Sequence, residues 1–436
     1  MQHVVVIGGG FAGLRVVRGL RRSPVRVTLV DRTNHHAFQP LLYQVATGGL
    51  SPGEIAPPLR WVLRKQKNAS VLLAKADRID VEAREVHVRT LDGDRTLRYD
   101  HLVVAAGARH SWFGNDEWAP FAPGLKTIDD ALELRRRIFG AFEHADVAAD
   151  PAERKRLLTF VVVGAGPTGV ELAGQLKEIS VQTLRSEYHR FDPADSKVVL
   201  VDAAPRVLGA FDETLSSRAL KALEGMGIEV RLGGAVEKVD ARGVTVGGER
   251  IEAGTVVWAA GVQASPLGAQ LAEATGAELD RGGRITVGDD FSLPGYPEVR
   301  VLGDLAASGL PGVAPVAMQQ GQWTAKSIDA VERRRAPPKP FKYHDHGSMA
   351  TIGRRRAVAH FGRIKISGTL AWMAWLLVHL MYVVGFANRV LVLVRWAAAY
   401  VAHGRGERVL SRVLPRSDRS GATPPADHGH EVPHVG

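Results

Sequence analysis

The sequence predicts an α/β protein with two doubly wound parallel sheets, the second inserted in the first, followed by an apolar helical region. Two short, continuously apolar runs, residues 4–7 and 160–163, each lead into a G-x-G-x-x-G turn and then a helical pattern. A late apolar strand, "EVRVL", follows both units, and the stretch "TLAWMAWLLVHLMYVVGF" lies beyond it. If the late strand returns to the first sheet, the second unit is an insertion.

Composition excludes several classes of protein. The 436 residues suffice for two or three domains of ~100–200 residues each. The net charge of +10 suits anionic lipid or anionic substrates, but no basic patch is interleaved with aromatic residues as nucleic-acid binding requires. The absence of cysteine excludes disulfides, thiolate metal sites and cysteine redox relays. No metal motif such as H-E-x-x-H occurs, and "MQHVVVIGGG" does not have the pattern of a secretory signal.

The first unit has the order of a Rossmann-like dinucleotide-binding domain. Gly8 allows the tight turn after the first strand, Gly10 admits a pyrophosphate to the backbone, and Gly13 lets helix and strand pack closely. The N–H groups of the helix N-terminus then face the phosphates. A second strand, "VRVTLVD", ends at Asp31, ~20 residues beyond the turn, where an acid accepts a hydrogen bond from a ribose 2′-hydroxyl.

The pattern recurs in "VVVGAGPTGVELAG", where Gly164, Gly166 and Gly169 take the same three positions. The strand "KVVLVD" ends at Asp202, and a polar segment fills the longer spacing between turn and acid. A carboxylate there accepts from a free 2′-hydroxyl and repels a 2′-phosphate, which favours NADH over NADPH. Arg206, shortly after Asp202, weakens this preference slightly.

Chain order assigns the two nucleotides. The late strand leads to Asp304, which would lie beside the first ligand if that strand returns to the first sheet. An acid there can bind a ribityl hydroxyl or a phosphate, so we expect FAD in the first domain and NADH in the inserted one. Because the chain has no nucleophile motif, we expect the cofactors to carry the chemistry and the protein to orient them.

Several segments together resemble the type II NADH dehydrogenases, the single-subunit flavin NADH:quinone oxidoreductases of the pyridine nucleotide-disulfide reductase-like superfamily. The segments are "GGGFAG", "NHHAFQPLLYQVATGGLSP", "VVVGAGPTGVELAG", "VVWAAGV", "VLGDLA", "APVAMQQG", "GSMATIGRRRAV" and "GFANR". The resemblance implies non-covalent FAD, hydride transfer from NADH to the flavin, and reduction of a membrane quinone, menaquinone or ubiquinone, without proton pumping. A homodimer stays possible.

By matching motifs, the resemblance also implies cofactor contacts. Those to FAD fall on Gly8, Gly9, Gly10, Phe11, Ala12, Gly13, Asp31, Arg32, His36, Ala76, Asp304 and Ala314. Those to NADH fall on Gly164, Gly166, Pro167, Thr168, Gly169, Asp202, Ala260 and Gly261. In the family, the segment matching "APVAMQQG" lines the quinone site, usually as A-Q-x-A-x-Q. Pro315 replaces the first glutamine here, and this departure puts one quinone hydrogen bond of that pattern in doubt.

Three side chains are candidates for catalytic roles. Glu171 follows the second glycine turn and is a candidate to relay or position a proton; the alternative is a carboxylate that only favours the helix N-terminus. Gln319 can donate an amide N–H to a quinone carbonyl, with Gln320 beside it, whereas the alternative is a helix-capping or core amide.

Residues 369–386 carry no Asp, Glu, Lys or Arg, but they are borderline for a membrane span, which needs ~20 apolar residues. Basic residues flank them, and Trp and Tyr cluster there as in an interfacial belt. Ala371 and Val378 fall on the helical side expected against protein, and Trp375 and Val383 on the side expected against lipid. We favour a membrane-associated, monotopic region of one or two helices on the cytoplasmic face of the cell membrane, in contact with anionic lipid. A span or a buried helix stays open.

The expected divisions are an FAD-binding domain at 1–125 and 286–336, an NADH-binding domain at 126–285, a membrane-anchoring region at 337–414 and a disordered tail at 415–436. Disulfide reductases and sulfide:quinone oxidoreductases need cysteines, which this chain lacks. Two other functions stay open: a soluble FAD-dependent NADH reductase of a protein or small molecule, and a membrane-bound NADH-sensing regulator.

Overall fold

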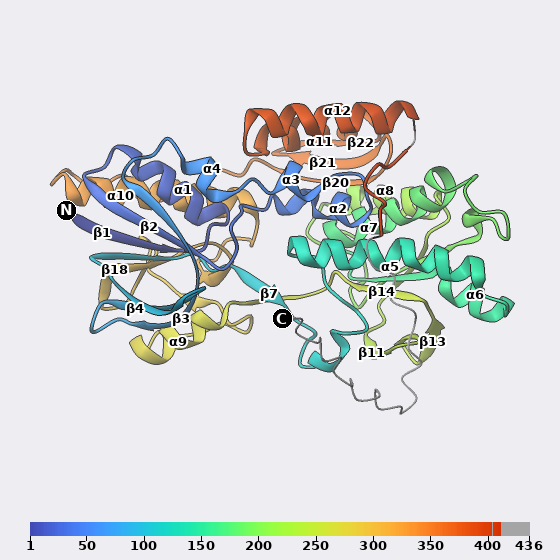
Figure 1. Ribbon diagram of the computed structural model, residues 1–436, viewed down its shortest axis with the longest axis horizontal. Helices are drawn as coiled ribbons and strands as arrows, with labels where there is room; N and C mark the ends of the chain where they lie inside the picture. The colour runs from blue at the N-terminus through green and yellow to red at the C-terminus, as the bar shows by residue number, and fades with distance from the viewer. Residues whose placement is uncertain (403, 411–436) are drawn as a thin grey trace, which may run out of the picture.

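The computed structural model describes residues 1–402 and 404–410, so the predicted tail at 415–436 lies outside the described residues. Two α/β domains lie side by side, and the C-terminal helices lie along the top of the molecule as drawn (Figure 1). The predicted fold class is confirmed in each of its three parts.

An eight-stranded sheet forms the first domain, with five adjacent parallel strands from β18 to β3. Its spatial order is β17 (Ser292–Leu293), β18 (Tyr296–Val301), β6 (His101–Val104), β1 (Gln2–Ile7), β2 (Val25–Asp31), β3 (Ala69–Asp80), β4 (Glu85–Thr90) and β5 (Gly93–Arg98). β18 pairs with β6 although the second sheet lies between them in sequence, so the second domain is an insertion. The central strands are buried and almost wholly apolar because helices or strands cover both faces.

The second domain has a parallel sheet and an antiparallel one. The parallel sheet has the order β10 (Glu229–Leu232), β9 (Lys197–Asp202), β8 (Thr159–Val163) and β14 (Thr255–Trp258). The antiparallel sheet contains β11 (Val236–Asp240), β12 (Gly243–Val246) and β13 (Glu249–Glu252). Two short pairs complete the strands: β7 (Ala108–His110) with β15 (Val262–Ala264), and β16 (Ile285–Thr286) with β19 (Ala306–Ala307). The β7–β15 pair runs between the two domains (Figure 1).

Helices cover both sheets. In the first domain these are α1 (Phe11–Gly19), α4 (Leu59–Leu63), α9 (Pro266–Thr275) and α10 (Ala314–Glu332). α2 (Leu42–Ala46) and α3 (Pro52–Ile55) instead lie between the second domain and the C-terminal helices (Figure 1). The second domain contributes α5 (Ile128–Val147), α6 (Pro151–Leu157), α7 (Pro167–Glu178) and α8 (Glu213–Glu224). Glycine lets α1 and α10 touch: a Cβ on Gly321 would lie 2.3 Å from the carbonyl oxygen of Ala12.

The C-terminal region begins with an antiparallel sheet of β20 (Ser348–Gly353), β21 (Arg356–Phe361) and β22 (Ile364–Ser367). Two helices follow, α11 (Thr369–Tyr382) and α12 (Phe386–Ala402), separated at Gly385, whose φ is +97°. The long apolar stretch is therefore interrupted by a residue that adopts left-handed backbone without strain. Within the described residues, every helix is too short or too polar to cross a bilayer.

The prediction of which side of α11 faces the protein was partly wrong. Ala371 is fully buried, as expected, but Trp375 and Val383 are buried as well. Trp375 fills the space between α11 and α2, where its ring lies 6.4 Å from that of Tyr43. Burying so large a ring removes more apolar surface from water than burying the small residues would. The exposed side consists of Leu370, Met373, Leu377 and Met381.

β20 lies directly on α7 in backbone-to-backbone contact. A Cβ placed on Gly174 would lie 1.7 Å from the carbonyl oxygen of Ile352, an atom that cannot move without displacing the strand. Only glycine permits so close an approach. The C-terminal region is thus fixed to the helix that starts at the second glycine turn.

A matched pair of glycine substitutions tests this contact. Gly140→Ala in α5 should leave the thermal midpoint unchanged or slightly raised, because its Cβ meets no atom within 4 Å and alanine favours helix. Gly174→Ala gains the same helix propensity but collides with Ile352, so we expect a midpoint several degrees lower and faster proteolysis between α10 and β20. Equal midpoints for the two variants, measured by calorimetry, would contradict the contact.

Candidate active site

The two glycine turns have the same geometry. Gly8 and Gly164 have φ of +100° and +106°, and a Cβ on either would lie within 3 Å of backbone atoms of the neighbouring strand connection. A Cβ on Gly169 would lie 1.7 Å from the carbonyl oxygen of Gly164, and one on Gly13 would lie 1.9 Å from that of Gly8. These four glycines are required by the fold itself.

The middle glycine of each turn differs, because its Cβ position is open. Neither Gly10 nor Gly166 would bring a Cβ within 4 Å of another group. Each is followed directly by a helix, α1 or α7, whose N-terminal N–H groups point toward the open side. An unfilled backbone face at a helix N-terminus suits the pyrophosphate of a dinucleotide, so both turns fit the cofactors that the sequence predicts.

Asp31 and Asp202, the acids that end β2 and β9, make equivalent hydrogen bonds to the two glycine turns. Asp31 accepts a hydrogen bond from the Gly9 amide at 2.5 Å, and Asp202 accepts one from the Ala165 amide at 2.5 Å. Each carboxylate therefore fixes its own glycine turn, a role that sequence reasoning did not assign. Asp31 also lines a cavity of about 320 Å³ together with Arg32 and Ala76, which brings together three residues predicted to contact FAD.

His36, also predicted to contact FAD, forms a hydrogen bond with the backbone of the first turn. Its Nδ1 lies 2.8 Å from the carbonyl oxygen of Gly9, and its ring meets that of Phe11 edge to face at 5.3 Å. Burial lowers the pKa of His36, so the ring is neutral and Nδ1–H donates to the carbonyl. His36 thus acts on the backbone of the turn.

Asp304 and the two glutamines meet at the start of α10. Asp304 lies 3.6 Å from Lys126, and the adjacent Gly303 amide donates to Oε1 of Gln320 at 2.8 Å. Gln319 Nε2 donates to the carbonyl oxygen of His344 at 2.8 Å, and its Oε1 accepts from the His344 amide at 2.9 Å. Both amides are engaged by the protein itself: Gln320 is buried, whereas Gln319 makes its bonds to His344 at the surface. Their direct roles toward a quinone stay predictions.

Glu171 lies one turn into α7 and faces the C-terminal region. Its Oε1 accepts a long hydrogen bond, 3.4 Å, from the amide of Thr351 on β20. Burial raises the pKa of Glu171 to about 8, and the Thr351 amide and the Trp375 indole offset only part of that rise. The side chain therefore holds a proton at neutral pH, and its role in relaying or positioning a proton stays a prediction.

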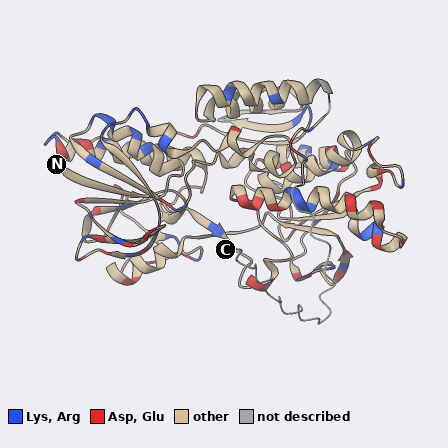
Figure 2. Ribbon diagram, viewed as in Figure 1, with Lys and Arg blue, Asp and Glu red and all other residues tan. Residues whose placement is uncertain are grey.

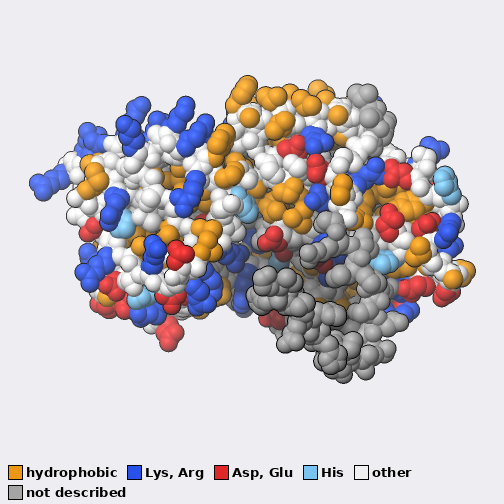
Figure 3. Space-filling model, in the orientation of Figure 1, with side chains coloured by type: hydrophobic (Ala, Val, Ile, Leu, Met, Phe, Trp, Pro, Cys, Tyr) orange, Lys and Arg blue, Asp and Glu red, His pale blue; other side chains and the backbone are white. Residues whose placement is uncertain are grey.

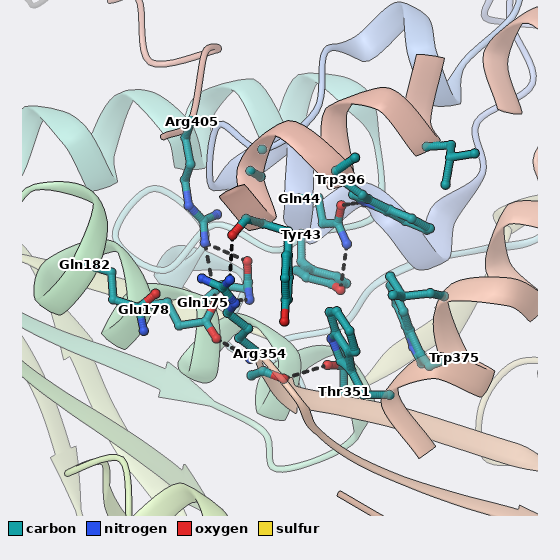
Figure 4. A pocket seen from close by; sticks show the side chains of 18 of the residues that line it. Tyr43, Gln44, Gln175, Glu178, Gln182, Thr351, Arg354, Trp375, Trp396 and Arg405 are labelled. Atoms are coloured by element: carbon teal, nitrogen blue, oxygen red, sulfur yellow. Dashed lines mark hydrogen bonds and ion pairs between the residues drawn. The ribbon is translucent and has the colours of Figure 1, made fainter. Parts of the chain in front are cut away.

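An apolar cavity of about 590 Å³ lies beneath α11 and α12 (Figure 4). Met373, Leu377 and Leu393 line its outer part and are themselves more than half exposed, so the cavity opens on the surface of the two helices. Its inner end is polar and is formed by Tyr43, Gln44, Gln175, Glu178, Thr351 and Arg405. An apolar channel with a hydrogen-bonding end suits an amphiphile with a polar head.

Sequence reasoning missed the inner end of this cavity. Tyr43 and Gln44 sit in an apolar helical pattern, and Arg405 lies far along the chain. The Arg405 side chain is only 10% exposed. It donates to the carbonyl oxygen of Thr47 at 3.0 Å and to Oε1 of Gln175 at 2.8 Å. One arginine therefore ties the C-terminal segment to both α/β domains.

Comparison with known proteins places the chain in a family. The sequence model of the pyridine nucleotide-disulphide oxidoreductases matches residues 2–321, and that of the NDH2 C-terminal domain matches residues 345–405. The type II NADH:quinone oxidoreductase NdhA of Mycobacterium tuberculosis is 49% identical over 94% of this chain and 89% of its own length. The type II NADH:quinone oxidoreductase of Staphylococcus aureus is 32% identical, over 81% of this chain and 88% of its own.

The fold agrees with that placement. The structure of NDH2 from Plasmodium falciparum in complex with NADH superposes with a TM-score of 0.82, over 93% of this chain and 99% of that one, at 17% identity. The chain is thus a pyridine nucleotide-disulphide oxidoreductase in its fold. Within that class it belongs to the type II NADH:quinone oxidoreductase family, as the sequence motifs predicted.

The buried proton of Glu171 predicts a pH-dependent stability. The folded state holds this proton up to about pH 8, whereas the unfolded chain releases it near the ordinary pKa of 4.5. The contribution of Glu171 to the free energy of unfolding is therefore full below pH 4.5 and is lost as the pH rises to 8. Relative to Glu171→Gln, which has the same shape and cannot ionise, the wild type should lose about 1 kcal/mol per pH unit in that window. Parallel denaturation curves at pH 5 and pH 8 would contradict a buried, protonated Glu171.

Proposed function

We propose that this chain oxidises NADH by hydride transfer to non-covalently bound FAD and passes two electrons to a membrane quinone. The observation that carries the proposal is the position of α7. Its N-terminus is the second glycine turn, and its later residues Gln175 and Glu178 line the apolar cavity. One short helix therefore connects a nucleotide site with a site suited to an amphiphile, and the relatives' names state both substrates.

When bound, the nicotinamide supplies the hydride and the flavin takes it up and reduces the quinone. The protein's own residues position the reactants. Gly10 and Gly166 leave backbone open to the pyrophosphates, and Asp31 and Asp202 fix the turns beside them. Glu171 holds a proton near neutral pH and is our candidate to supply one of the two protons that quinone reduction consumes.

The surface of α11 and α12 supports contact with a membrane. Leu370, Met373, Leu377, Met381, Phe386, Leu391, Leu393 and Val394 are each more than half exposed. Together they define an apolar face, seen along the top of the space-filling view (Figure 3). So large a patch of aliphatic side chains is unfavourable in water and favourable in the acyl boundary of a lipid leaflet.

Basic residues border this apolar face. Arg60, Arg64 and Lys65 on and after α4 are exposed, and Lys and Arg are frequent on that side of the first domain (Figure 2). The Arg64 guanidinium lies 4.3 Å from the centre of the Trp61 ring, which in turn borders Gly385 between α11 and α12. We infer that α4 places cations at the level of anionic headgroups when the apolar face enters the leaflet, on the cytoplasmic side of the cell membrane.

Turnover with a soluble quinone tests the function. FAD-loaded protein should consume NADH far faster with menadione than without it, and NADPH more slowly, because Asp202 disfavours a 2′-phosphate. A spectrophotometric assay of nicotinamide absorbance measures both rates. NADH consumption that does not respond to menadione would reject the quinone assignment and favour an NADH-sensing regulator, or a reductase of another acceptor.

Vesicle binding tests the apolar face. Leu377→Asp combined with Met381→Asp should lower the partition coefficient onto phosphatidylglycerol vesicles at least about tenfold, because two large side chains lose their transfer free energy. Val147→Asp is the control, since Val147 is 70% exposed on α5, away from the apolar face. Equal co-sedimentation of the wild type, the double variant and Val147→Asp with the vesicles would contradict docking through α11.

A further inference from the structure

Three side chains form a hydrogen-bonded series at the inner end of the cavity. Trp396 Nε1 donates to Oε1 of Gln44 at 2.7 Å, and Nε2 of Gln44 donates to the hydroxyl oxygen of Tyr43 at 3.0 Å (Figure 4). An indole N–H can only donate, so it fixes which end of the amide is the oxygen. The amide nitrogen then has to donate, so the Tyr43 oxygen is the acceptor.

With the Gln44 amide oriented in this way, the hydroxyl hydrogen of Tyr43 is not used in either of these two hydrogen bonds. Among the described residues, the hydrogen bond from Gln44 is the only one to the Tyr43 hydroxyl. The side chain is nearly fully buried, and it lines the cavity. A buried hydroxyl normally finds a partner, which points to a ligand that accepts a hydrogen bond.

The other polar side chains at this end engage one another. Gln175 Nε2 donates to Glu178 at 2.9 Å, and Gln175 Oε1 accepts from Arg405. Glu178 also accepts from the Arg354 amide. These pairs leave two buried donors that line the cavity, the Tyr43 hydroxyl and the Trp375 indole N–H. The indole faces Glu171, so Tyr43 is the donor open to an incoming ligand.

We propose that the Tyr43 hydroxyl donates a hydrogen bond to a carbonyl oxygen of the quinone head group, and that Trp396 and Gln44 set the direction of that bond. The inference rests on the proposed function and names the residue that binds the electron acceptor. Burial raises the pKa of Tyr43 well above its ordinary value, so the phenol stays protonated. A donor whose oxygen already accepts from Gln44 favours the carbonyl of a quinone over the hydroxyl of the quinol, which assists release of the reduced product.

Trp396 belongs to α12, so the series also connects ligand recognition to the position of the membrane-facing helix. If α12 shifts, the Trp396 hydrogen bond breaks, the Gln44 amide becomes free to rotate, and the direction of the Tyr43 hydrogen is lost. Trp396 and Gln44 are thus positioning residues, and Tyr43 is the one that touches the quinone.

The test uses FAD-loaded, full-length enzyme and menadione. Tyr43→Phe should lower kcat/KM for menadione roughly 3- to 10-fold, the value of one neutral hydrogen bond, and weaken menadione binding measured by tryptophan quenching by a similar factor. The rate of flavin bleaching by NADH in the absence of quinone should not change. Tyr188→Phe is the matched control, because that hydroxyl donates to Glu143 outside the cavity.

A double-mutant cycle tests the series itself. Trp396→Phe should lower kcat/KM for menadione in the wild-type background and have no further effect in Tyr43→Phe, because the two act on one hydrogen bond. Unchanged menadione binding and turnover in Tyr43→Phe would overturn the inference while leaving the proposed function intact. Additive effects would overturn the positioning role of Trp396. An inactive wild type would instead reject the proposed function.

Discussion

The contact between α7 and β20 at Gly174 sets the position of the C-terminal region, and the apolar cavity depends on that position. It brings the C-terminal sheet onto the helix whose N-terminus forms the second nucleotide turn. At 1.5 Å per residue, the distance along α7 from Gly166 to Glu178 is about 18 Å. Within that distance lie the nucleotide turn, the buried acid Glu171 and the wall of the apolar cavity. A bulkier residue at this position would separate the C-terminal region from the nucleotide site.

The charged groups around the cavity are of two kinds. Glu171 is buried and His379 partly so, and neither has a salt-bridge partner among the described residues. Burial drives both toward the neutral form: it lowers the pKa of His379 to about 4 and raises that of Glu171 to about 8. Arg405 and Glu178, by contrast, lie 3.7 Å apart and share Gln175. The two unpaired groups under α11 are therefore neutral, while the charges of Arg405 and Glu178 in the cavity wall are paired where the three parts of the chain meet.

Local sequence patterns predicted the parts of the fold that depend on local geometry. The glycine turns, the strand-terminal acids and the returning strand all follow from spacing along the chain, because a tight turn into a helix imposes its own residue types. The cavity could not be predicted in this way. Tyr43, Gln44 and Trp396 come together only through packing of α2 against α12. Trp375 and Leu377 lie on different sides of α11, but both are apolar, so the pattern does not show that Trp375 is buried and Leu377 exposed. Likewise, the anchoring of Gln319 to His344 depends on the path of a connecting segment.

The cavity mouth opens among exposed residues of α11 and α12, the same residues that form the apolar face. On the proposed function, the enzyme takes its two substrates from two different solvents, water and lipid. NADH arrives by diffusion in three dimensions through water, whereas the quinone arrives by lateral diffusion within a leaflet. Its effective concentration is then a mole fraction in lipid, so diluting the membrane with inert phospholipid lowers the rate even when the total quinone in the sample is constant.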